Sequence, residues 1–164
     1  MNFGQPGDVF GAIHAAGNPN TCAAQYVGCT GTPNSSHPFM RSFLTVEGDF
    51  STTSPKRLVA TDTTYNAFGY FLASLGVQSG VTPPGSSGRL CLSGSIGRYS
   101  NSVLSTGFVG TFSLVISPLA ISQPAGPVAA LAGQTWYFQA WHRDIDASGI
   151  PSSNFTYAAG LPFQ

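Results

Sequence analysis

The chain has 164 residues, and only 7% of them are charged, against roughly 25% in ordinary soluble domains. Six basic and six acidic residues give a formal net charge of zero. Binding to nucleic acid or to an anionic membrane surface needs clustered Lys and Arg, so the composition argues against both classes. The chain contains no run of 18 apolar residues, and we expect no membrane span.

The length predicts one domain with a real hydrophobic core. A surface with so little charge gives copies of the chain little long-range repulsion. Two interpretations follow: a secreted monomer coated with Ser, Thr and Gly, or a subunit that self-assembles. The first residues, 1–6, lack the basic and apolar regions of a signal peptide, so we expect a secreted form to start at a processed end.

In chain order, an irregular extension comes first, and we place it at residues 1–32, before a β-sandwich domain at 33–164. Gly, Pro and Asn dominate the extension, which could pack on its own domain or on a neighbouring subunit. From residue 39 onward, short runs of alternating or continuous apolar residues predict strands. The predicted strands are Arg41–Glu47, Lys56–Thr61, Ala67–Ser74, Arg89–Ile96, Phe108–Ser117, Val128–Leu131, Gly133–Asp144 and Phe155–Ala159. Short strands with Gly and Pro turns, and no helical periodicity, predict an all-β protein. We expect an antiparallel sandwich of the jelly-roll or immunoglobulin-like type.

The predicted strand Gly133–Asp144 contains both tryptophans of the chain. Because side chains alternate along a strand, Trp136 and Phe138 point one way, and Tyr137 and Trp141 point the other. We assign the first face to the core. The second face needs a covering layer or a partner. Aromatic residues dominate protein–protein hot spots, so Tyr137, Trp141 and Tyr99 are our candidate interface residues.

The sequence contains few candidate metal-binding or catalytic residues. Asp144, Asp146 and Ser148 match the first half of a calcium loop, but the acid expected at its last position is replaced by Phe155. The alternative for this segment is a polar turn. No two histidines have metal-ligand spacing, and we expect His142 to orient the end of its strand through a hydrogen bond. The nucleophile motif Gly-x-Ser-x-Gly is missing, so we predict no enzyme and no cofactor.

The three cysteines are Cys22, Cys29 and Cys91. In a chain this poor in lysine we expect an extracytoplasmic protein in which a disulfide is permitted. A Cys29–Cys91 bond would close a long loop, and a Cys22–Cys29 bond a short one.

Several motifs resemble those of a β-domain that occurs, usually at the C-terminus, in large secreted bacterial multidomain proteins. They cover about 130 residues in matching order and are Pro33-Asn34-Ser35-Ser36, Phe68–Ser74, Gly88–Tyr99, Gly110–Leu114, Ala132–Asp144 and Ser153–Thr156. The resemblance implies a non-catalytic domain of exported proteins and favours Cys29–Cys91 as the disulfide. Unlike those domains, we expect this one to stand alone without a preceding catalytic module, and it has an extra N-terminal segment with Cys22; both features favour an independent structural role.

We therefore expect an extracellular or cell-surface β-sandwich subunit that acts by protein–protein packing. We expect a homo-oligomer, in a filament or a surface layer. The alternative is a carbohydrate- or surface-binding accessory module that uses Trp141 and tyrosines, with a glycan as partner. A calcium-stabilised accessory domain and a hydrolase are further alternatives.

Overall fold

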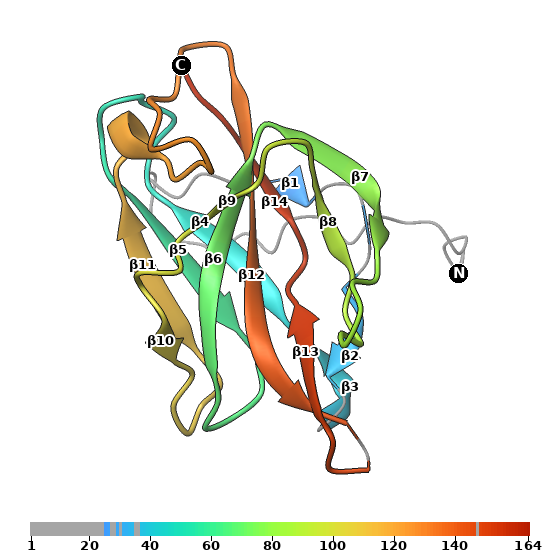
Figure 1. Ribbon diagram of the computed structural model, residues 1–164. Helices are drawn as coiled ribbons and strands as arrows, with labels where there is room; N and C mark the ends of the chain where they lie inside the picture. The colour runs from blue at the N-terminus through green and yellow to red at the C-terminus, as the bar shows by residue number, and fades with distance from the viewer. Residues whose placement is uncertain (1–24, 27–28, 30, 35–36, 147) are drawn as a thin grey trace, which may run out of the picture.

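The computed structural model describes residues 25–26, 29, 31–34, 37–146 and 148–164, and nearly every regular element in it is an antiparallel strand (Figure 1). The one helix among these residues is a short 3-10 turn at Pro118–Ala120. No helix in this part of the chain is long and apolar enough to cross a membrane. The all-β class is confirmed.

The larger sheet has seven strands in the order β1-β14-β12-β6-β10, with β13 also paired to β12 and β9 to β6. Its central strand is β12, because β12 pairs with β6, β13 and β14. The bounds are β1 Gln25–Tyr26, β6 Phe68–Ser74, β9 Gly97–Arg98, β10 Leu104–Ser105, β12 Thr135–Ile145, β13 Pro151–Phe155 and β14 Ala159–Pro162.

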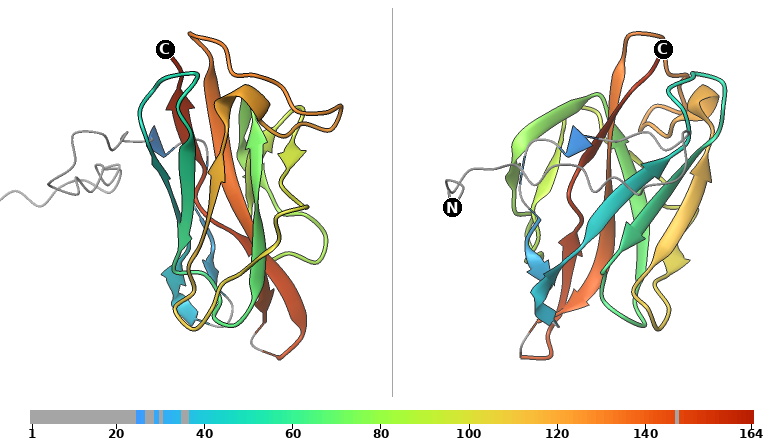
Figure 2. Two further views of the ribbon diagram at one scale, coloured as in Figure 1. Left: turned by 90° about the vertical axis from the view of Figure 1, so that its left-hand side faces the viewer. Right: turned by 180° about the vertical axis from the view of Figure 1, so that it is seen from behind.

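The smaller sheet has three strands in the order β11-β5-β4, and it faces the larger sheet as a second layer (Figure 2). Its bounds are β4 Phe43–Glu47, β5 Lys56–Thr61 and β11 Phe112–Ile116. Alternate residues of these strands, such as Leu44, Leu58 and Phe112, are buried against Phe71 and Phe138 of the larger sheet. The predicted sandwich is therefore confirmed, with one apolar core between two antiparallel sheets.

Two hairpins complete the fold. Strands β2 (Pro33–Asn34) and β3 (His37–Arg41) pair beside the sandwich, and β7 (Gly76–Val81) pairs with β8 (Leu90–Ser93). A second apolar cluster lies between the β7–β8 hairpin and the outer face of the larger sheet, and it includes Leu72, Leu92 and Phe155. The larger sheet is thus covered on both faces by its own chain over much of its area.

Part of the predicted N-terminal extension joins the sandwich. Gln25 and Tyr26 pair with Gly160 and Ala159 at the edge of the larger sheet. This two-residue strand therefore packs on its own domain. Cys29, Gly31 and Thr32 of the extension are also described, whereas residues 1–24, including Cys22, and residues 27–28 and 30 lie outside the described residues.

Several predicted strand limits were wrong. The strand expected at Phe108–Ser117 begins only at Phe112, because Gly107 and Gly110 have φ angles of 58° and 65° and form a turn. The closing strand expected at Phe155–Ala159 falls on the break between β13 and β14. There Thr156 donates its backbone N–H to Ala140 O, and the N–H of Tyr157 bonds to Ser42 O, so the chain leaves the larger sheet.

The single lysine of the chain is buried. Lys56 lies on the inner side of β5 with its side chain 0% exposed, and its Nζ donates a 2.8 Å hydrogen bond to Asp49 Oδ1. The same ammonium lies 5.8 Å from the centre of the Phe163 ring. The hydrogen bond from Lys56 holds the pKa of Asp49 below its ordinary value. Lys56 thereby links the β4–β5 connection to the C-terminal segment at one end of the core.

Candidate functional site

The outer face of β12 is covered mainly by the same chain. Tyr137 and Trp141 both belong to the apolar cluster beneath the β7–β8 hairpin, and both are half-buried. The Tyr137 ring packs on Gly160, where an added Cβ would lie 2.9 Å from the ring. Trp141 stacks on Tyr70, with ring centres 5.0 Å apart and planes 28° apart. These two candidate interface residues therefore help to hold the fold.

The third candidate, Tyr99, lies elsewhere. Its ring packs against the main core between the sheets, and its hydroxyl oxygen accepts a 3.3 Å hydrogen bond from the backbone N–H of Ser122. Burial raises the pKa of Tyr99 to about 12, and the hydrogen bond from Ser122 offsets only part of this effect. The structure therefore does not bring the three candidate residues together on one surface.

The geometry of Trp141 also bears on the carbohydrate alternative. Sugar rings stack on an open aromatic face, but one face of the Trp141 indole is occupied by Tyr70. The ring of Phe68 lies 6.0 Å from Trp141 at a 50° tilt and is 46% exposed. Trp141 is therefore packed against two aromatic neighbours of its own chain. The arrangement gives no support to a flat sugar-stacking platform.

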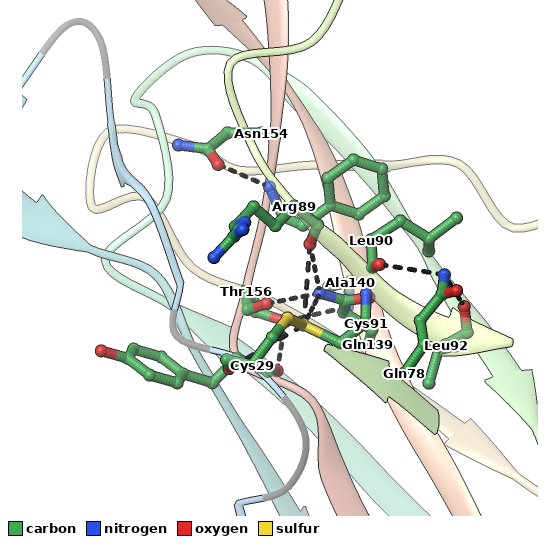
Figure 3. The surroundings of a disulfide bond; sticks show 12 residues. Cys29, Gln78, Arg89, Leu90, Cys91, Leu92, Gln139, Ala140, Asn154 and Thr156 are labelled. Atoms are coloured by element: carbon green, nitrogen blue, oxygen red, sulfur yellow. Dashed lines mark hydrogen bonds between the residues drawn. A yellow bond between two sulfur atoms is a disulfide. The ribbon is translucent and has the colours of Figure 1, made fainter. Parts of the chain in front are cut away.

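The disulfide joins Cys29 to Cys91, as the resemblance implied, with the two Cα atoms 5.7 Å apart (Figure 3). Beside it lies Gln139, which is fully buried on the outer face of β12. Its Oε1 accepts a 3.0 Å hydrogen bond from the N–H of Cys91, and its Nε2 donates to Arg89 O at 2.9 Å and Thr156 O at 2.8 Å. Gln139 therefore joins the hairpin to the larger sheet, and the disulfide joins the hairpin to the segment between β1 and β2.

A buried polar cluster replaces the apolar core at one end of the sandwich. Ser42 Oγ lies 3.0 Å from His142 Nε2 and donates toward Asn34 Oδ1 at 3.0 Å. Asn154 Nδ2 also donates to Asn34 Oδ1, at 3.1 Å. All four side chains are 0–1% exposed. The cluster therefore connects β2, the junction between β3 and β4, β12 and β13, and His142 orients the end of its strand through a hydrogen bond, as predicted.

The Ser42–His142 pair does not form a catalytic arrangement. His142 Nδ1 lies 3.3 Å from the backbone oxygen of Arg143, where a catalytic triad would place a carboxylate. Burial lowers the pKa of His142 to about 4, although Arg143 O and Asp144 act in the opposite direction. The imidazole is therefore neutral at pH 7 and closed off from solvent.

The calcium candidates form a turn. Asp146 Oδ1 accepts hydrogen bonds from the N–H groups of Ser148 and Ile150, at 2.9 and 2.8 Å. Asp144 is fully buried, and its Oδ1 accepts from Thr64 Oγ1 at 2.8 Å. The two carboxylates thus serve different parts of the fold, as in the polar-turn interpretation. Among the described residues, no three His, Cys, Asp or Glu side chains are grouped as metal ligands.

In the part of the chain that the structure describes, the most exposed apolar pair in adjoining positions lies on a turn that the sequence analysis did not predict. Phe108 is 87% exposed and Val109 is 74% exposed, between β10 and β11. The turn is fixed to the β5–β6 loop, because Asn66 N donates to Gly107 O at 2.8 Å and Thr63 N to Gly110 O at 3.0 Å. The signal in the sequence is an apolar pair between two glycines.

The same turn is anchored from below by Thr106, which is fully buried. Thr106 Oγ1 accepts a 2.8 Å hydrogen bond from Ala67 N, and Thr106 N donates to Ala67 O at 3.0 Å. Thr63 Oγ1 adds a second hydrogen bond to Gly110 O. The backbone is therefore ordered on both sides of Phe108 and Val109, and these two side chains form what we call the apolar tip.

No family model, curated protein or solved structure matches this chain. The resemblance to a β-domain of secreted bacterial proteins therefore stays a prediction. The function of the chain has to be argued from its own surface.

Proposed function

We propose that this chain is an extracellular, non-catalytic β-sandwich subunit that packs against other copies of itself in a repeating assembly. The apolar tip is the observation that carries the proposal. Folding normally buries large apolar side chains, yet here the five hydrogen bonds described above fix a turn that leaves Phe108 and Val109 in solvent. Because the backbone is already ordered, docking this tip costs little conformational entropy.

Two further features support the proposal. The Cys29–Cys91 disulfide fits an oxidising compartment. The chain has only twelve charged side chains among 164 residues and no net charge, so copies can approach closely without long-range repulsion.

The test compares Phe108→Ser with the unmodified chain and with Phe39→Ser, since Phe39 is 99% exposed on β3. Analytical ultracentrifugation and negative-stain imaging measure the size of the assemblies. We expect Phe108→Ser to reduce the assemblies to species no larger than a dimer and Phe39→Ser to leave the assemblies intact. Equal loss with both variants would indicate non-specific aggregation, and a strictly monomeric unmodified chain at high concentration would refute the proposal.

A further inference from the structure

The β11 strand forms an open edge of the smaller sheet. It pairs with β5 on one side, from Phe112↔Ala60 to Ile116↔Lys56, and no strand formed by the described residues follows it on the other. On that side no backbone hydrogen bond reaches residues 112–116 from any described residue. In Figure 2 (left) the strand lies on the side of the molecule that faces the viewer. Its outward N–H and C=O groups are a template for another strand.

This edge lacks the features that protect most sheet edges. Proteins place Lys, Pro or a bulge on such strands to prevent pairing with other chains. Residues 112–116 read Phe-Ser-Leu-Val-Ile, and their register with β5 is continuous. No Asp, Glu, Lys or Arg occurs anywhere from residue 99 to residue 141. The whole segment that carries β10, β11 and the apolar tip is therefore uncharged.

The side chains of β11 also leave apolar surface to be covered. Val115 is 63% exposed on the outer face of the sheet. Leu114 packs against the main core from the inner face and is only partly buried. A strand added beside β11 would cover both side chains. It would also extend the core past the present edge of the sandwich.

The occupant that fits is β11 of a second copy. An antiparallel pair centred on Leu114 places Val115 opposite the second copy's Ser113 and Phe112 opposite its Ile116, so each face stays matched. In this two-fold arrangement both copies use the same surface, the open edge of β11, for the contact. Both charged residues of β5 that pair with β11, Lys56 opposite Ile116 and Arg57 opposite Val115, form ion pairs with Asp49 and Glu47, at 2.8 and 3.1 Å, so two such edges meet without repulsion.

We propose that β11 pairs antiparallel with β11 of a second copy and joins two three-stranded sheets into one continuous sheet. This inference rests on the proposed self-assembly and names one of its contacts. The apolar tip then supplies a separate contact, through which dimers join into larger assemblies.

The test places a lysine on the edge. Val115→Lys adds a charge to the outer face of β11, and Thr45→Lys adds the same charge to the exposed outer face of β4, at the opposite edge of the same sheet. We expect Val115→Lys to lower the sedimenting mass at least two-fold and Thr45→Lys to leave it unchanged. In the assembled unmodified chain, hydrogen exchange over residues 112–116 should slow by about tenfold or more relative to Val115→Lys.

The outcomes separate this inference from the proposed function. If the unmodified chain is monomeric, self-assembly itself fails. If the chain assembles but Val115→Lys assembles equally well, and residues 112–116 exchange rapidly in both, only the β11 contact is refuted. If the edge is protected but deletion of residues 1–24 removes the protection, the occupant is the N-terminal segment, which also refutes pairing between two β11 strands.

Discussion

The side-chain oxygen of Gln139 accepts a 3.0 Å hydrogen bond from the backbone N–H of Cys91, and this bond joins the middle of β12 to one half of the disulfide. Both residues are completely buried. The amide therefore fills a position on the outer face of the sheet where an apolar residue would leave three backbone groups of neighbouring segments without partners.

Replacing this amide should weaken the fold strongly. In Gln139→Leu the N–H of Cys91 and the carbonyls of Arg89 and Thr156 lose their partner, at a cost of about 3 kcal/mol or more in the free energy of unfolding. Gln78→Leu is the matched control, because Gln78 is half-buried and water can replace its bonds. Urea denaturation measures both. A smaller loss for Gln139→Leu than for Gln78→Leu would contradict this account.

Removing the disulfide should cost a similar amount. The bond closes a loop with a sequence separation of 62 residues, which in the loop-entropy model stabilises the folded state by about 4 kcal/mol. The double variant Cys29→Ser/Cys91→Ser should therefore unfold at a markedly lower denaturant concentration. Cys22→Ser is the control and should keep the midpoint of the unmodified chain. An unchanged midpoint in the double variant would show that the bond does not stabilise the fold.

Acid should destabilise the protein through His142. Burial holds its pKa at about 4, whereas the unfolded chain binds a proton on this imidazole below about 6.5. The unfolded state thus binds more protons between these values, and stability falls as the pH drops from 6.5 to 4, by about 3 kcal/mol in total. Unfolding curves across this range should show the slope in the unmodified chain and lose it in His142→Gln. The same slope in both proteins would exclude His142 as its origin.

The fold was largely predictable, because its long strands have strong apolar patterns. Residues 56–61 were predicted with the limits that the structure has, and β12 was recognised from its alternating aromatic residues. Strand β7 was missed since Gly, Gln and Ser give it little periodicity. The break after Phe155 was missed because it depends on a hydrogen bond from Tyr157 to Ser42, more than a hundred residues away.

The candidate site was less predictable, because it depends on contacts between residues that lie far apart in the sequence. Alternation predicted that Tyr137 and Trp141 share a face, but only the three-dimensional structure shows that the β7–β8 hairpin covers it. The pairing of Ser42 with His142 joins residues 100 positions apart. Exposure of Phe108 follows from positive φ angles at two glycines, which turn a predicted strand into a tip.

Those glycines provide a further test. At Gly110 the φ angle is 65°, and an added Cβ would lie 2.3 Å from the backbone oxygen of Thr63. At Gly94 the φ angle is 72°, but nothing lies within 4 Å of an added Cβ. Gly94→Ala should cost about 1–2 kcal/mol from backbone strain alone. Gly110→Ala should cost about 2 kcal/mol more, because the turn has to move, and thermal unfolding of the two variants checks the difference. Equal melting temperatures would mean that the turn is not rigid.

The burial of Lys56 has a consequence for handling the protein. Reagents that acylate amines find no exposed ε-amino group on the folded chain, since its single lysine is enclosed. Biotin esters and glutaraldehyde should therefore react with the folded sandwich only at an α-amine, and lysine-specific proteases should not cleave it. Modification of Lys56 itself would then report opening of the core, and the rate of modification would measure how often the core opens.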